Sequence, residues 1–161
     1  MQSGPFVSAC FAVKEPFMRY LGLDIGDKTI GVAVSDPLQI SAQGVMTIER
    51  IGVKKDTTKV LELAKEYDAG TIVSGLPLML SGEDSPQTQK VREFVERLQN
   101  KARSQGMKLR FEFQDERFTT KIAEDVLIAA DMSRAKRKTI IDRQAAVIIL
   151  QSYLDAHRKT E

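Results

Sequence analysis

The sequence predicts an α/β domain in which a mixed β-sheet is flanked by helices, and three observations predict it. Short apolar runs lie close together over residues 20–48, which is typical of an antiparallel meander. Later apolar segments alternate between strand and helix patterns, as in parallel crossover connections. The 161 residues, 42% of them hydrophobic, are enough for one packed core and therefore for one domain.

The meander starts in the stretch around which the chain is organised, YLGLDIGDKTIGVAVSD at residues 20–36. Tyr20–Ile25 and Ile30–Val34 are apolar runs separated by turn residues, which predicts a β-hairpin, and Val45–Ile48 is a third strand. Asp24 lies near the end of the first strand. A carboxylate among apolar residues costs free energy unless it is paired. Asp24 is therefore either a turn acid satisfied locally or a metal ligand.

The rest of the chain alternates helices and strands with recognisable boundary residues. Asp56 is expected to cap the first helix and Gly70 to end it, and Ser85-Pro86 is a helix start. The expected elements are a helix over 53–67, a strand over 71–73, a helix over 85–103, a strand over 109–113, a helix from Thr119 or Thr120 to 130, and a helix over 140–153.

Composition excludes few functions. The 24 basic and 22 acidic residues nearly balance, so any nucleic-acid-binding surface must come from clustering. The single cysteine, Cys10, allows no disulfide within a chain, which fits a cytoplasmic location. No apolar run approaches the ~20 residues of a membrane span, so no membrane partner is expected.

Residues 1–17 lack the basic start of a secretion signal, and Lys14-Glu15-Pro16 interrupts their apolar part. They are expected to be an N-terminal extension, disordered or not native, before one domain over 18–161. The alternative is an extra edge element that packs through its apolar residues.

Acidic residues stand at the ends of several expected elements. They are Asp24, the pair Asp115-Glu116 after the last strand, and Asp142 early in the last helix. Oxygen ligands suit Mg²⁺ or Mn²⁺, and two such ions ~4 Å apart would activate water at a phosphodiester. Each acid also has a structural alternative. Asp115-Glu116 would suit a helix N-terminus, and Asp142 could pair with Lys138.

Two further features bear on this chemistry. A basic run over residues 134–138 precedes Asp142 and is either a phosphate contact or a solvated loop. The only histidine, His157, lies in the polar C-terminal tail, where it is expected to be solvated.

Four motifs in order along the chain resemble a known family. They are LGLDIGDKTIGVAVSD, GLP, DERFTT and IDRQAAVIILQSYLD. Together, over residues 18 to about 155, they resemble the YqgF/RuvX family of bacterial ribonuclease H-like proteins. The resemblance implies a ribonuclease H-like fold with a five-stranded mixed sheet. It also implies a metal-dependent nuclease that processes the 5′ end of pre-16S rRNA in ribosome biogenesis. The alternatives are a Holliday junction resolvase acting on four-way DNA and a catalytically silent nucleic-acid-binding module.

The resemblance also implies roles for particular residues. The expected catalytic acids are Asp24, Asp115, Glu116 and Asp142, and the expected ligands of two Mg²⁺ or Mn²⁺ ions are Asp24, Glu116 and Asp142. The expected nucleic-acid contacts are Arg117, Thr119, Thr120, Arg134, Lys136, Arg137 and Lys138. The loop after GLP reads Leu78-Met79-Leu80-Ser81-Gly82 and lacks the Asn and Asp usual in the family, which puts its substrate contacts in doubt.

Some alternatives stay open at this point. The first strand also looks like the phosphate-binding hairpin of actin-like ATPases, which need two such domains where this chain has room for one. The sequence does not choose between structured RNA and branched DNA, between endo- and exonucleolytic action, or between monomer and homodimer.

Overall fold

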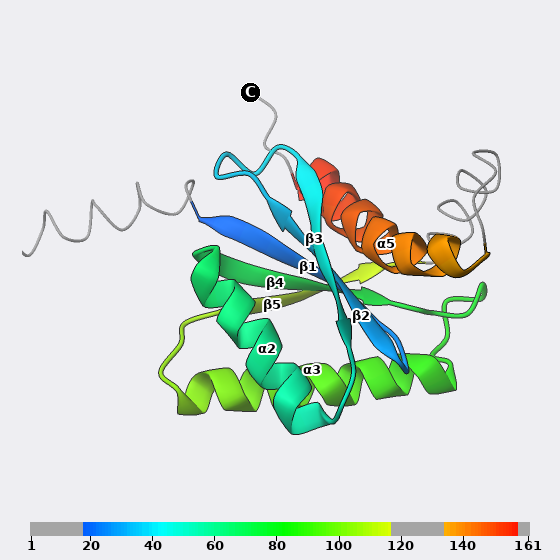
Figure 1. Cartoon of the computed structure of the whole chain (residues 1–161), viewed down its shortest axis with the longest axis horizontal. Coiled ribbons are helices and arrows are strands. Elements are labelled where there is room, and N and C mark those ends of the chain that lie inside the picture. Colours follow the sequence, from blue (N-terminus) through cyan, green and yellow to red (C-terminus); the bar gives the residue numbers. More distant parts are fainter. Residues whose placement is uncertain (1–17, 117–133, 158–161) are drawn as a thin grey trace, which may run out of the picture.

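The computed structural model describes residues 18–116 and 134–157, with side chains in the last helix described from Arg143 onward (Figure 1). Its centre is a five-stranded sheet in the order β3-β2-β1-β4-β5. Strands β1 (Arg19–Ile25), β2 (Thr29–Ser35) and β3 (Ala42–Glu49) form the antiparallel half. The meander predicted from the closely spaced apolar runs is confirmed.

The other half of the sheet is parallel, as the alternation of later elements predicts. Strand β4 (Ala69–Leu76) pairs in parallel with β1, and β5 (Arg110–Asp115) pairs in parallel with β4. Helices α2 (Val53–Glu66) and α3 (Pro86–Ser104) cover one face, and α5 (Arg134–His157) covers the other (Figure 1). The three layers make a mixed sheet flanked by helices.

Alternation along β1 assigns its side chains to the two faces. Leu21, Leu23 and Ile25 belong to the larger core under α2 and α3. Gly22 faces α5, and a Cβ built on it would lie only 2.7 Å from Cβ of Leu150. The glycine therefore lets α5 approach the sheet closely, and Asp24, two residues on, faces the same side.

The start of α3 is as predicted. The Ser85 hydroxyl accepts a hydrogen bond from Thr88 N at 3.1 Å, and the Ser85 amide donates to the Thr88 hydroxyl at 3.0 Å. These reciprocal bonds form a capping box, with Pro86 at the first helical position.

The predicted cap of α2 is wrong. Gly52 is the N-cap residue, and Asp56 lies one turn inside the helix, where it is buried. Its carboxylate accepts from Ile51 N and from Arg50 Nε, both at 3.0 Å. Arg50 also donates to Gly26 O at 2.8 Å and lies over the Phe94 ring at 4.9 Å. Asp56 thus forms an ion pair with Arg50, whose side chain links α2, α3 and the β1–β2 turn.

Two other boundaries differ from the prediction. Asp68, with φ of 54°, provides the turn after α2, and Gly70 already belongs to β4. Helix α5 already includes Arg134, so the basic run lies on this helix and not in a loop before it. It ends at His157, beyond the expected Tyr153. The helix expected between residues 119 and 130 lies outside the described residues.

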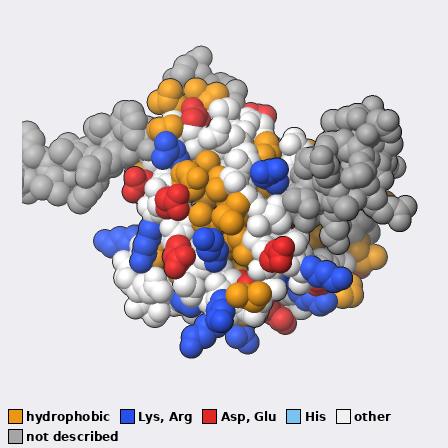
Figure 2. Space-filling model, viewed as in Figure 1, with side chains coloured by type: hydrophobic (Ala, Val, Ile, Leu, Met, Phe, Trp, Pro, Cys, Tyr) orange, Lys and Arg blue, Asp and Glu red, His pale blue; other side chains and the backbone are white. Residues whose placement is uncertain are grey.

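One surface of the molecule appears in Figure 2, where an apolar strip is bordered by side chains of both charges. A shallow groove beside β3 and α2 includes Met46, Ile48 and Ile51. The presence of both charges around the strip fits the near balance of basic and acidic residues in the sequence. Among the described ranges, no helix combines the length and apolar character needed to cross a bilayer.

Candidate active site

Asp24 and Glu116 lie side by side although they are far apart in sequence. Asp24 is the penultimate residue of β1, and Glu116 directly follows β5. Because β1, β4 and β5 are parallel, their carboxyl ends meet at one edge of the sheet, where α/β proteins place their sites. The Glu116 amide donates to Leu76 O at 3.2 Å, which extends the β4–β5 pairing by one residue. The two carboxyl groups are joined by a side-chain hydrogen bond.

The electrostatics of Glu116 follow from this position. Glu116 is only 8% exposed, and burial raises the pKa of its carboxyl group from 4.5 to about 8. The negative charges of Asp24 and Asp115 and the hydrogen bond with Asp24 act in the same direction. Two neighbouring carboxylates therefore retain a proton near neutral pH when no cation balances them.

Gly75, in β4, provides the space that Glu116 occupies. A Cβ built on Gly75 would lie 2.7 Å from Oε2 of Glu116 and 2.5 Å from Cδ1 of Ile149. The carboxyl group and helix α5 therefore both pack against bare backbone. The strand expected over residues 71–73 ends before Gly75, so this role, which depends on contacts between β4, β5 and α5, was not predicted.

Asp115 and Glu116 differ in their surroundings. Asp115 is the last residue of β5, pairs with Leu76 in the sheet register and is exposed. Glu116 is buried and is the one hydrogen-bonded to Asp24. Asp115 acts on this pair through its charge.

Asp142 lies on helix α5, which covers the face of the sheet that carries Asp24. Position 142 precedes Ala146 by one helical turn, and Ala146 O lies 3.2 Å from the Cβ position built on Gly22. The Asp142 side chain lies outside the described part of the chain. Among the described side chains, no group of three or more His, Cys, Asp or Glu residues could hold a metal ion.

The predicted nucleic-acid contacts are described only in part. Arg117, Thr119 and Thr120 lie outside the described residues. The basic run Arg134, Lys136, Arg137 and Lys138 is described as helix backbone without side chains. His157 is exposed at the end of α5, with Nδ1 2.9 Å from Tyr153 O, and it is not part of the acid pair.

The fold places the chain in the ribonuclease H-like class. It is similar to the fowlpox virus resolvase in complex with Holliday junction DNA, with a TM-score of 0.56 at 15% identity, covering 88% of this chain and 100% of that one. It is also similar to T. thermophilus RuvC in complex with a Holliday junction, with a TM-score of 0.51 at 14% identity, covering 86% and 94%. At such low identity these similarities concern the fold alone.

The sequence then identifies the family. Residues 18–156 match the RuvX family, described as Holliday junction resolvase, and the chain belongs to that family. A protein of Clostridium novyi (strain NT) is 48% identical over 139 residues, covering 86% of this chain and 99% of the relative. One of Clostridioides difficile (strain 630) is 51% identical over 137 residues, covering 85% and 94%. Both carry the name "Putative pre-16S rRNA nuclease". The resemblance seen in the four motifs is confirmed.

Proposed function

We propose that this protein is a metal-dependent nuclease that hydrolyses phosphodiester bonds at the 5′ end of pre-16S rRNA, in the cytoplasm. The observation that carries the proposal is the contact between Asp24 and Glu116 at the carboxyl edge of the sheet. Two adjacent carboxylates destabilise each other's charged forms, and a divalent cation between them removes that cost. The names of the relatives support RNA as the substrate.

The donor set fits a hard cation, because it consists of carboxylate oxygens. Asp24, Glu116 and Asp142 would hold two Mg²⁺ or Mn²⁺ ions. When bound, such ions activate water and stabilise the leaving oxygen of a phosphodiester. The described residues position the Glu116 carboxyl group: Gly75 leaves room for it, and its burial limits its contact with water.

The phosphate contacts complete the proposal. Arg134, Lys136, Arg137 and Lys138 lie in the first turns of α5, the helix that carries Asp142. They would bind substrate phosphates together with Arg117, Thr119 and Thr120. Changing the four basic residues to Gln is expected to weaken RNA binding and to flatten its dependence on salt. An unchanged salt slope would contradict this role.

A second candidate function is resolution of four-way DNA, which the family description favours. Paired cuts in a four-way junction need two active sites, and a homodimer would supply them. Sedimentation analysis with and without junction DNA would test this: a monomer that stays monomeric on the junction argues against a resolvase.

The test is a cleavage assay on the purified chain. The protein is incubated with Mg²⁺ or Mn²⁺ and offered a pre-16S rRNA fragment and a four-way DNA junction in parallel. Metal-dependent cleavage of the RNA at a defined 5′ site, abolished by EDTA, is the expected result. Cleavage of the junction alone favours the second candidate. Binding without cleavage of either substrate would make the chain a silent binding module, and hydrolysis of ATP would favour the actin-like alternative.

A further inference from the structure

A groove of about 760 Å³ lies at the edge of the sheet opposite the acid pair. The amino ends of β1, β4 and β5, the loop after β2 and the end of α5 line it. We call it the amino-edge groove and define it by Arg19, Tyr20, Ile40, Lys108, Arg110 and His157. Its volume falls within the range of small-molecule sites, about 300–1,000 Å³.

Among the described residues that line the groove, the charged ones are all basic. Arg19, Lys108 and Arg110 contribute cations, and none of the described residues that line the groove is acidic. Arg110 makes an exposed ion pair with Glu112 at 3.4 Å, which offsets part of its charge. Lys108 is exposed and has no ion-pair partner among the described side chains. An anion entering the groove would therefore meet a net positive potential.

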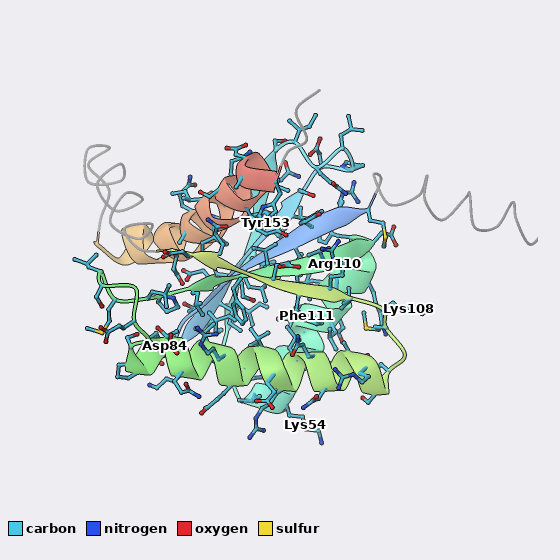
Figure 3. The ribbon with its side chains drawn as sticks, turned by 180° about the vertical axis from the view of Figure 1, so that it is seen from behind. Lys54, Asp84, Lys108, Arg110, Phe111 and Tyr153 are labelled. Atoms are coloured by element: carbon cyan, nitrogen blue, oxygen red, sulfur yellow. The ribbon has the colours of Figure 1, made fainter. Side chains whose placement is uncertain are left out.

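Aromatic rings form one side of the groove. The Tyr153 ring lies between Tyr20, at 5.7 Å between ring centroids, and His157, which stacks on it at 3.9 Å. Tyr153 is buried, whereas His157 ends the stack and is exposed. In Figure 3, Tyr153 on α5 lies above β5, Arg110 begins that strand, and Lys108 precedes it. A flat ligand could extend the stack from the imidazole.

Apolar side chains form another part of the lining. Met18 is 39% exposed, Leu38 61% and Ile40 49%. Exposed apolar side chains gathered beside a concave surface are typical of a binding site. The groove therefore combines cations for an anion with rings and apolar side chains for a flat, weakly polar group.

We propose that the amino-edge groove binds a nucleotide. Lys108 and Arg110 hold the phosphate, and the base packs between the His157 ring and the apolar side chains. The nucleotide is either a free mononucleotide or one residue of a bound single strand, because both offer the same phosphate and base. The groove is separate from the acid pair, since the six residue-to-residue steps of extended chain from Arg110 to Glu116 span roughly 20 Å.

The test is an NMR titration of the ¹⁵N-labelled full chain without divalent metal. AMP, inorganic phosphate, polyglutamate and a short single-stranded RNA are added separately. AMP is expected to shift the amide signals of Lys108, Arg110, Tyr20 and His157. The two sources are separated by affinity: tighter binding of the RNA than of AMP identifies a strand, and equal affinity identifies a free nucleotide.

Variants sharpen the test. Lys108→Gln removes one phosphate contact and His157→Ala removes the exposed ring. Each is expected to weaken AMP binding by roughly fivefold to tenfold, the lower end of the scale of one charged hydrogen bond or one stacked base, because both side chains are exposed. Lys54→Gln is the matched control, because Lys54 is an exposed lysine on α2, away from the groove (Figure 3).

Four results would overturn the proposal. The first is the absence of shifts with both AMP and RNA, and the second is shifts confined to Asp24, Glu116 and their neighbours. The third is phosphate producing the same shifts at the same affinity as AMP, which would show an anion site only. The fourth is polyglutamate competing as well as AMP, which would show a surface for acidic peptides. The titration does not depend on cleavage, so it still tests the groove if the proposed nuclease activity fails.

Discussion

The two faces of the sheet are built differently. The face under α2 and α3 is a continuous apolar core to which β1 contributes Leu21, Leu23 and Ile25. The face under α5 has a smaller core, in which Gly22 and Gly75 expose backbone to the helix and Asp24 and Glu116 lie at the edge. The comparison shows that stability and the candidate chemistry draw on opposite sides of the same strands.

The largest expected effect comes from removing one charge of the acid pair. Asp24→Asn keeps the size of the side chain but loses the charge that would hold a cation. We expect cleavage to fall by at least roughly two orders of magnitude, the scale on which a single stabilising group acts. The fold should persist, and stability without metal should rise because Glu116 no longer lies beside the negative charge that helps to keep it protonated.

Cleavage rates across a Mg²⁺ titration, with circular dichroism as the folding control, measure both effects. Cleavage at the wild-type rate would show that the acid pair is not the active site.

A second prediction tests the close packing on the α5 face. Gly75→Ala places a methyl group against Glu116 and Ile149, and we expect a loss of roughly 1–3 kcal/mol of stability. Cleavage should fall as well, because Glu116 must move. Urea denaturation and the cleavage assay measure the two losses.

Gly70→Ala, in the same strand, is the matched control. Its Cβ would meet the flexible end of Met18 at 3.0 Å, which can move aside, so little change is expected. Equal losses in both variants would mean that alanine is tolerated poorly along β4 in general.

A third prediction concerns pH. Because the pKa of Glu116 is raised from 4.5 to about 8, the folded state holds a proton that the unfolded state releases. The contribution of this proton to the free energy of unfolding is complete below about pH 4.5 and is lost as pH rises toward about 8. The free energy of unfolding should fall by up to about 1.4 kcal/mol per pH unit across this window.

Denaturation at a series of pH values measures the slope. Glu116→Gln should remove this part of it, and Mg²⁺ should reduce it in the wild type by favouring the charged carboxylates. The same slope in wild type and variant would place the titrating group elsewhere.

The smallest effect is expected in the opposite core. The Ser74 hydroxyl is buried and has no hydrogen-bond partner among the described residues. Ser74→Ala removes this unsatisfied group, so stability should stay equal or rise by up to about 1 kcal/mol. Thermal unfolding measures the change, and a clear loss would indicate an internal water bound at that hydroxyl.

The same difference between faces explains what the sequence could predict. The apolar run over residues 20–25 predicted the strand that carries Asp24, and the parallel pairing of β1, β4 and β5 brings Glu116 to the same edge of the sheet. The role of Gly75 could not be predicted, since it depends on three elements meeting. Asp56 was predicted to be a helix cap because a carboxylate near a helix start suits that role. A carboxylate at the same place also suits a buried ion pair with Arg50, which is what the structure has. Residues 134–138 have no apolar side chains at helical spacing, so the sequence did not predict the first turns of α5.

Arg50 has a consequence for how Asp24 is held. It contacts Asp56 at the start of α2, the Phe94 ring of α3 and the carbonyl group of Gly26, two residues after Asp24. The turn that follows Asp24 is therefore anchored by α2 and α3, which contribute no residue to the acid pair. This anchoring reduces the conformational entropy that ordering the carboxylate would otherwise cost when a ligand binds. Natural variation at Arg50 should therefore alter ligand affinity through rigidity, without changing any group that touches the ligand.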